Sequence, residues 1–373
     1  GWTSILKIAD GSAIDAIASA VALSNGRLEN FRIDCNQANA PGSTKNRGIY
    51  LHTSYGFINR IQVANAANAG IYLNDDGISG ALGYLNFVVF CDLSDSTGVG
   101  LRWEYPFTDS WVMFNNIGST TYNIQGEAGP TRLFGNHLNG SPTRNLHFPG
   151  ASDSLLAMFN LMEGARQEAI FVEITAADPD KKTRMRLSHN IIRASGQQTN
   201  NTYDAVVVKG IAPTAGPVSH QLQQVYLDHN EIYSTEANKP RYGIRIEYAD
   251  SIQLDGNTFD GMVSGQIAMR EGTVSDVSIT GTIPQNYTIY DLTAAASRLK
   301  TNRGTATLLT GNTTIVVTHG LFAAPTVLRV HPSKDTAGKR WWVDTWTATQ
   351  FTINIDSAAG ADIDFFWDAE VTI

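Results

Sequence analysis

A short phrase recurs along this chain: a leucine, two intervening residues, an asparagine, and an apolar residue one or two positions later. It occurs at residues 133–138, 187–192, 227–232 and 254–259, and each copy follows a strand-like segment of the type Gly-Ile-x-Ile. Repeats of this size are typical of stacked supersecondary units rather than of one closed core. A stack of β-coils presents a long flat face, which suits an extended polymer better than a small metabolite.

The composition agrees with a β-rich stack. Hydrophobic residues make up 42% of the 373 residues, which is ample for a core, whereas charged residues reach only 17%. Globular proteins usually contain about 25% charged residues. Glycine, asparagine, serine and threonine fill the difference, and they favour β-structure with many tight turns over helical bundles.

The charges and cysteines exclude several classes of protein. The net charge is −8 and the chain has no long basic run, so we expect no nucleic-acid partner. No apolar run approaches the roughly 20 residues of a membrane span, so we expect no membrane insertion. Cys35 and Cys91 are predicted to be buried free thiols. The chain begins with Gly1, without a methionine or a signal peptide, and is expected to be truncated at its N-terminus.

Segments that alternate apolar and outward-pointing residues predict one strand of each successive coil. These segments are 48–51, 70–73, 98–101, 122–124, 145–148, 169–172, 205–208, 243–246 and 266–269. Asparagines at the turns between strands are predicted to adopt the left-handed conformation and to hydrogen-bond from coil to coil. They are Asn116, Asn136, Asn160, Asn190, Asn230 and Asn257.

The phrase Val-x-Leu-x-x-Asn-x-Ile, together with Gly-Ile-x-Ile, resembles the right-handed parallel β-helix of the pectate-lyase-like superfamily. Residues 31–36 also resemble a segment found early in such helices. The resemblance covers residues 1–290 and implies an all-β fold built on a right-handed parallel β-helix solenoid. It is specific for the fold and says little about the reaction.

The repeat pattern stops near residue 290, and residues 291–303 are predicted to be a connector with a short helix over 291–300. Residues 304–373 predict a small antiparallel, β-sandwich-like C-terminal domain, because alternating strands follow one another closely. Its segments 318–327 and 364–367, with Trp342, resemble C-terminal modules of bacteriophage tail proteins. A β-helix with such a module resembles a phage tailspike, which implies a homotrimer that binds and often cuts bacterial surface polysaccharide.

Stacked coils should align their outward side chains in columns, because neighbouring residues of a strand point to opposite faces. One predicted column contains Tyr50, Tyr72, Gly100, Asn123, Asn145, Phe171, Val207, Arg245 and Ala268. The adjacent predicted column contains His52, Asn74, Arg102, Gln125, His147, Glu173, Lys209, Glu247 and Arg270.

Glu173 and Glu247 are the predicted catalytic pair, with Glu127 as a substitute. One coil, that of Lys209, separates them, so their backbones should lie about 9 to 10 Å apart. Carboxyl groups about 6.5 to 9.5 Å apart suit an inverting glycosidase, in which one acid protonates the leaving oxygen and the other activates water. The alternative is a surface column of alternating charges that avoids like-charge repulsion.

Substrate binding is assigned to cations, a histidine and aromatic platforms for sugar rings. These residues are Arg245, His147, Arg102, Lys209, Tyr72 and Trp103. An alternative for Trp103 and its aromatic neighbours is a satellite core beneath a loop. A lyase is a further alternative, with His147 as the base and a cation that stabilises the enolate.

The leading hypothesis is therefore a phage tailspike-type protein that binds and hydrolyses a bacterial capsule, O-antigen or exopolysaccharide. The alternatives are a non-catalytic glycan-binding adhesin or virion structural protein, and a polysaccharide lyase. The expected partners are the polysaccharide, two further copies of the chain, and the rest of the virion through a missing N-terminal region. We expect assembly in the host cytoplasm and action at the host surface. No zinc spacing, phosphate-binding glycine loop or nucleophile elbow occurs, so no metal or cofactor is predicted.

Overall fold

The structure is a computed structural model. It describes residues 4–9, 14–19, 21, 23–39, 45–74, 83–104, 107–118, 120–126, 131–149, 154–174, 183–211, 222–269, 275–280, 289–291, 301–321, 323–336 and 338–371.

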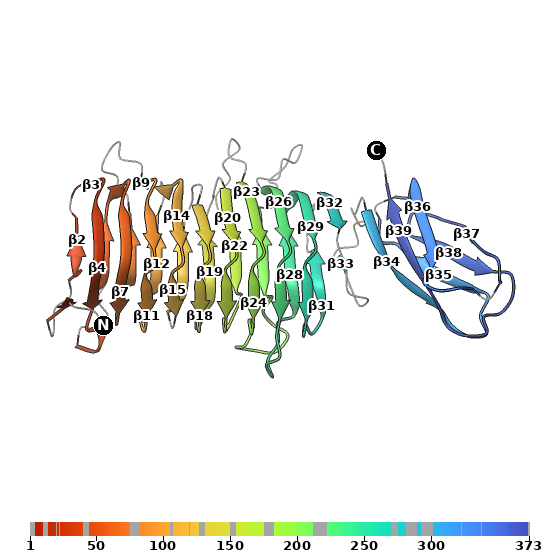
Figure 1. Ribbon diagram of the computed structural model, residues 1–373, viewed down its shortest axis with the longest axis horizontal. Coiled ribbons are helices and arrows are strands. Elements are labelled where there is room, and N and C mark those ends of the chain that lie inside the picture. The colour runs from red at the N-terminus through yellow and green to blue at the C-terminus, as the bar shows by residue number, and fades with distance from the viewer. Residues whose placement is uncertain are drawn as a thin grey trace.

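Two long parallel sheets form an elongated solenoid, and a separate group of antiparallel strands follows at its C-terminal end (Figure 1). One sheet has eleven strands: β2 (Ile17–Ala18), β5 (Arg47–Leu51), β8 (Ala69–Leu73), β12 (Val99–Trp103), β16 (Tyr122–Gly126), β19 (Arg144–Pro149), β22 (Ile170–Glu173), β25 (Val206–Lys209), β28 (Tyr242–Glu247), β31 (Gly265–Met269) and β33 (Ile289–Asp291). Every strand-like segment predicted for the successive coils lies in this sheet, so the chain is the expected parallel β-helix.

The second parallel sheet has eighteen strands and wraps the other sides of each coil. They are β1 (Ile5–Lys7), β4 (Arg27–Asp34), β7 (Phe57–Ala64), β10 (Phe87–Val89), β11 (Asp92–Ser94), β14 (Ser110–Met113), β15 (Asn116–Gly118), β17 (Thr131–Phe134), β18 (His137–Asn139), β20 (Ser154–Met158), β21 (Leu161–Glu163), β23 (Thr183–Ser188), β24 (Ile191–Arg193), β26 (Leu222–Asp228), β27 (Glu231–Tyr233), β29 (Ala249–Asp255), β30 (Thr258–Asp260) and β32 (Ser275–Thr280). Short pairs β3 (Leu23–Ser24) with β6 (Thr53–Ser54), and β9 (Gly83–Tyr84) with β13 (Phe107–Thr108), flank the coils, and η1 (Gln37–Asn39) is a single 3-10 turn.

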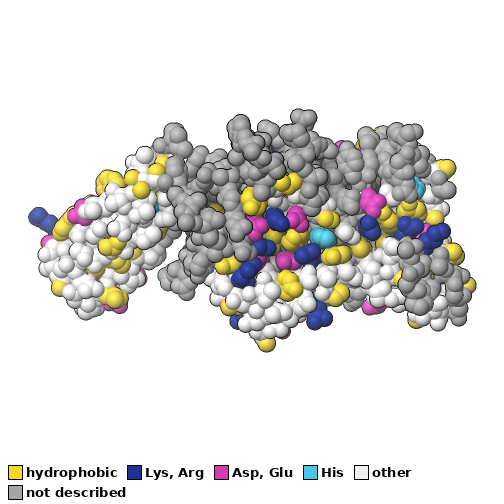
Figure 2. All heavy atoms as spheres, turned by 180° about the vertical axis from the view of Figure 1, so that it is seen from behind, with side chains coloured by type: hydrophobic (Ala, Val, Ile, Leu, Met, Phe, Trp, Pro, Cys, Tyr) yellow, Lys and Arg dark blue, Asp and Glu magenta, His cyan; other side chains and the backbone are white. Residues whose placement is uncertain are grey.

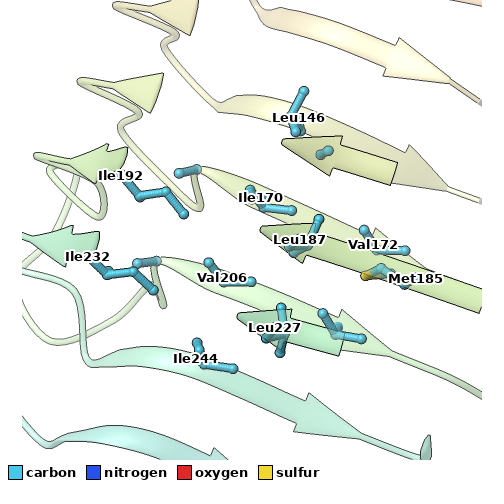
Figure 3. Packing of buried hydrophobic residues seen from close by; sticks show 14 of the residues in the cluster. Leu146, Ile170, Val172, Met185, Leu187, Ile192, Val206, Leu227, Ile232 and Ile244 are labelled. Atoms are coloured by element: carbon cyan, nitrogen blue, oxygen red, sulfur yellow. The ribbon is translucent and has the colours of Figure 1, made fainter. Parts of the chain in front are cut away.

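The apolar side chains of both parallel sheets fill the interior of the coils. Figure 3 shows Ile170 and Val206 of the eleven-stranded sheet and Leu187 and Leu227 of the other sheet pointing into the same space. Each is at most 1% exposed. Because full burial of such a side chain contributes about 1.5 to 3 kcal/mol, this continuous core is the main stabilising term of the solenoid.

The two cysteines also belong to this core. Cys35 and Cys91 are buried and unpaired, as predicted. Burial raises the pKa of both thiols to about 12. Since the thiolate is the reactive form, neither thiol is available for redox chemistry in the folded protein.

A row of buried asparagines connects one coil to the next. Asn115 donates from Nδ2 to Oδ1 of Asn136, Asn136 to Asn160, Asn160 to Asn190, Asn190 to Asn230 and Asn230 to Asn257, each at 2.9 to 3.0 Å. The predicted hydrogen bonding from coil to coil is confirmed at Asn136, Asn160, Asn190, Asn230 and Asn257. The predicted left-handed conformation is wrong, because positive φ falls on the residue before each of these asparagines. The placement of Asn116 in this row is wrong as well. Asn115 occupies the buried position, and Asn116 is exposed and donates to Asp92 instead.

The C-terminal strands form two antiparallel three-stranded sheets. One contains β34 (Thr301–Leu308), β39 (Ile363–Glu370) and β36 (Val327–Pro332), and the other β35 (Thr314–Thr318), β38 (Gln350–Ile355) and β37 (Trp341–Asp344). Phe351 of one sheet packs edge-on against Trp367 of the other, with ring centroids 5.6 Å apart, so the predicted sandwich is present. Of the predicted helix over 291–300, residues 292–300 lie outside the described residues, and Asp291 ends β33.

The asparagine row yields a stability prediction. Asn190→Ala removes the hydrogen-bond partner that the Asn190 side chain supplies to the Ala157 carbonyl and to the backbone N–H of Asn160. We expect a loss of at least about 2 kcal/mol in the free energy of unfolding, because each buried polar group left unsatisfied costs about 1 to 3 kcal/mol. Asn116→Ala should stay within about 0.5 kcal/mol of the wild type, since Asn116 is exposed. Urea denaturation of both variants measures the difference, and equal losses would contradict the assigned role.

Candidate functional site

The register of the eleven-stranded sheet determines which side chains line up on its outward surface, called here the outer face. Its main column runs from one coil to the next through Tyr50, Tyr72, Arg102, Gln125, His147, Phe171, Val207, Arg245 and Ala268. The predicted columns are therefore correct at most coils and wrong at three of them, β12, β16 and β19, where the alignment shifts by two residues.

Close backbone contact explains the shift. A Cβ atom on Gly70 would lie 2.6 Å from the carbonyl oxygen of Gly100, and one on Gly100 would lie 2.6 Å from that of Asn123. Gly100, rather than Gly98, is thus the counterpart of Gly70. As a consequence Arg102 and His147 lie in one column with Tyr72 and Phe171 and not in the column of Glu173.

The predicted catalytic glutamates lie in one column, with Lys209 between them. Glu173 pairs in register with Lys209, and Lys209 with Glu247. Two strand spacings separate the glutamate backbones by about 9.6 Å. Lys209 Nζ lies 2.5 Å from Glu173 Oε1, and Arg245 donates from Nη1 to Glu247 Oε1 at 2.9 Å. The column therefore alternates in charge, and the Glu173 side chain, 28% exposed, is more accessible than that of Glu247, 9% exposed.

His147 lies one strand before Phe171, between two aromatic rings. Its ring centroid is 4.5 Å from that of Tyr122 and 5.7 Å from that of Phe171. Its Nδ1 is buried and has no hydrogen-bond partner among the described residues. Burial, helped by the nearby Arg144 guanidinium, lowers the pKa of His147 to about 4. The imidazole is therefore neutral at neutral pH and is able to accept a proton.

A second group of side chains lies toward the N-terminal end of the outer face. The guanidinium of Arg102 lies 4.8 Å from the ring centroid of Tyr72, and its Nη2 donates to Glu104 Oε1 at 2.6 Å. Burial and a hydrogen bond with Glu104 raise the pKa of the Tyr72 phenol. Tyr72 is 7% exposed, and its ring centroid lies 5.3 Å from that of Tyr50. Its ring is therefore largely enclosed and offers little surface to a sugar.

One predicted site residue, Trp103, does not join the outer face. Trp103 is 1% exposed and packs against Phe148 in the core, because it lies one position after the outward-pointing Arg102. The prediction that Trp103 contacts substrate is corrected accordingly. Glu127 lies outside the described residues. Trp111, an aromatic neighbour in the sequence, pairs with Phe87 and Arg132 in the eighteen-stranded sheet.

Several charged residues of the outer face were missed by sequence reasoning. They lie at or near the beginnings of the strands: Asp15, Arg47, Arg144, Glu168, Asp204 and Arg241. Arg47 binds Asp15 through two nitrogens at 2.8 Å, and Arg144 Nε donates to Glu168 Oε2 at 2.7 Å. For all of them except Arg241, which stands four positions before Arg245, the signal in the sequence is a charged residue three positions before an outward residue, as Arg47 stands before Tyr50 and Arg144 before His147.

Seen from behind, the solenoid carries a band in which acidic, basic and apolar side chains are interspersed (Figure 2). Among the described residues, no group of three or more His, Cys, Asp or Glu side chains is placed to hold a metal ion. In the same part of the chain no helix is both long enough and apolar enough to cross a membrane.

Comparison with known proteins gives likenesses in structure alone. No family profile matches the chain, and no curated protein matches its sequence. The Dettilon tailspike protein is 9% identical over 98% of this chain and 87% of its own, with a TM-score of 0.49. A tailspike mutant of E. coli bacteriophage HK620 in complex with pentasaccharide is 13% identical over 93% and 76%, with a TM-score of 0.47. The A-module of the Azotobacter vinelandii mannuronan C-5 epimerase AlgE6 is 14% identical over 75% and 81%, with a TM-score of 0.42. At these identities and TM-scores the likenesses carry no argument about this chain, and its parallel β-helix rests on the strand pairing described above.

His147 should make the stability of the solenoid depend on pH. Its native pKa of about 4 lies below the value of about 6.5 expected in the unfolded chain. As the pH falls through this window the unfolded chain binds the proton first, so the native state loses stability. His147→Gln removes this loss, and its urea midpoint should fall less between pH 7 and pH 4 than that of the wild type. Gln125→Asn is the control, because Gln125 lies one strand before His147 in the same column and carries no titratable group, so its profile should follow the wild type. Parallel profiles for all three proteins would contradict the burial of a neutral imidazole.

Proposed function

We propose that this chain is a tailspike-type protein that binds a bacterial surface polysaccharide along its outer face and hydrolyses it with Glu173 and Glu247. The observation that supports the proposal is the register Glu173, Lys209, Glu247, flanked by the ring of Phe171 and the guanidinium of Arg245. We extend the proposal to a homotrimer that belongs to a phage virion and acts at the host surface.

The two carboxylates suit different steps of an inverting hydrolysis. Glu173 is the more accessible of the two and lies beside Lys209, where a water molecule is able to reach it. It is assigned to water activation. Glu247 is assigned to protonation of the leaving oxygen, which requires Arg245 to release it and bind a sugar hydroxyl when substrate arrives. Their backbone spacing of about 9.6 Å leaves room for a water molecule between acid and base once the side chains lean together.

A second candidate function is a polysaccharide lyase, and His147 favours it. Its imidazole lies in the outer-face column and is neutral at neutral pH, as a general base must be, although the lowered pKa makes it a weak base for the proton next to a uronate carboxyl group. Arg102 is two strands away in the same column, and a cation there is placed to stabilise the enolate. A lyase product carries a new carbon–carbon double bond that absorbs in the near ultraviolet, whereas a hydrolase product does not.

Carboxamide substitutions test the hydrolase. Glu173→Gln and Glu247→Gln keep the shape of each side chain and remove the acid or base, so turnover should fall by at least about 100-fold in each. The assay measures release of reducing ends from a panel of bacterial capsules and lipopolysaccharides. Glu231→Gln is the matched control, because Glu231 is an exposed carboxylate on β27 of the other parallel sheet.

The outcomes separate the candidates. Unchanged turnover in both outer-face variants, together with its loss in His147→Gln and ultraviolet-absorbing products, replaces the hydrolase with the lyase. Binding of glycans without any product from the wild type leaves a non-catalytic adhesin. Loss of activity in Glu231→Gln as well would contradict the location of the site on the outer face.

A further inference from the structure

Each arginine and lysine side chain within strands β5 to β28 of the eleven-stranded sheet has a carboxylate partner. The pairs are Arg47 with Asp15 at 2.8 Å, Arg102 with Glu104 at 2.6 Å, Arg144 with Glu168 at 2.7 Å, Lys209 with Glu173 at 2.5 Å, and Arg245 with Asp204 at 2.6 Å and Glu247 at 2.9 Å. Arg241, just before β28, also binds Asp204, at 2.9 Å. The described part of the outer face is therefore a row of ion pairs without a surplus of positive charge.

Aromatic rings hold the arginines of these pairs from a second side. The guanidinium of Arg47 lies 3.5 Å from the ring centroid of Tyr50, and that of Arg144 lies 3.9 Å from the ring centroid of Phe171. A guanidinium that both stacks on a ring and binds a carboxylate is fixed in place. Such an arginine does not swing out to meet an anion on a ligand unless it gives up both contacts.

This arrangement is unfavourable for a negatively charged polymer. A binder of polyanions relies on uncompensated cations that attract the polymer and displace its counterions. On the outer face a carboxylate neutralises each described cation at close range, and the whole chain carries a net charge of −8. A polymer with a carboxylate on each repeat would meet the glutamates and aspartates as often as the arginines.

The same arrangement is favourable for hydroxyl groups. A guanidinium has five N–H donors and a carboxylate about four acceptor sites, and one ion pair uses only part of them. Alternating donors and acceptors along the column match sugar hydroxyls, each of which both donates and accepts. The rings of Tyr50, Tyr122 and Phe171, which are partly exposed, add apolar contact for the carbon–hydrogen faces of the sugars.

We propose that the outer face selects uncharged polysaccharides over polyuronates and other polyanions. This inference rests on the proposed function, and it favours the hydrolase over the lyase, because a lyase needs a uronate. Binding of a neutral glycan should change little with salt, since no counterions are released.

A gain of binding tests the charge balance directly. The double variant Glu104→Gln, Glu168→Gln leaves Arg102 and Arg144 without these carboxylate partners and so creates two uncompensated cations on coils two strands apart. The probe is immobilised polygalacturonate. The wild type should show no retention, and the double variant should bind at least about ten-fold more tightly at low salt than at 0.3 M salt, because salt screens exposed charges. The control, Glu231→Gln with Asp260→Asn, makes the same change of net charge on exposed positions of the other sheet and should gain nothing.

Thermal unfolding verifies that each variant is folded, and the single Glu104→Gln variant serves where loss of the more buried Glu168 prevents folding. Salt-sensitive binding of polygalacturonate by the wild type, or an equal gain in the control, overturns the inference. A parallel panel of bacterial polysaccharides sorted by charge tests the preference for neutral glycans separately from the glycan-binding function. Binding restricted to acidic members overturns the neutral-glycan assignment and leaves the glycan-binding function standing, whereas binding of no member overturns both.

Discussion

The hydrogen bonding between successive coils is the constraint on which the rest of the structure depends. Backbone N–H groups at one corner of the solenoid are satisfied by the side chain of an asparagine in the next coil, as Asn136 N is by Asn160 Oδ1 and Asn160 N by Asn190 Oδ1, each at 3.0 Å. An unsatisfied buried polar group is expensive, so a coil that slipped along the axis or by one residue would leave several such groups unpaired. The same bonds therefore fix the register that aligns Glu173 with Lys209 and Glu247 on the opposite sheet.

The corner that supplies these asparagines also carries backbone strain. The residue before each buried asparagine takes positive φ: Phe114 and Phe159 at 57°, His189 and His229 at 53°. Bulky residues rarely adopt this conformation, and glycine takes the same place at Gly135 and Gly256. Contact between neighbouring rings offsets part of the cost, since the centroids of His189 and His229 lie 5.0 Å apart with planes 7° from parallel. Ring stacking and the asparagine hydrogen bonds hold the turn in this conformation despite the strain, and the conformation places the asparagine inside.

The strands were predictable because the apolar alternation is local, whereas the alignment between coils is not. A segment such as Gly98-Val99-Gly100-Leu101 contains two glycines that both match the pattern, and only the contact of Gly70 with the carbonyl of the next coil decides between them. For the same reason the local pattern does not distinguish the buried Asn115 from the exposed Asn116, or the buried Trp103 from the outward Arg102 before it. Local sequence patterns also fail to reveal the ion pairs that were missed, because the two partners are far apart in the sequence. Arg144 and Glu168 are 24 residues apart, and they meet only once the coils are in register.

On the outer face, structural organisation and the proposed catalysis would compete for the same groups. Ion pairs and stacked rings hold the side chains in fixed positions before any ligand arrives, which lowers the entropic cost of binding. Those contacts also occupy the carboxylates that the proposed chemistry needs, since Glu173 is bound to Lys209 and Glu247 to Arg245. A sugar hydroxyl that replaces Lys209 or Arg245 at a carboxylate exchanges one hydrogen bond for another, so this release requires no large loss of free energy. An uncharged glycan is able to make that exchange as donor and as acceptor, and in doing so it would uncover both carboxylates where the glycosidic bond lies.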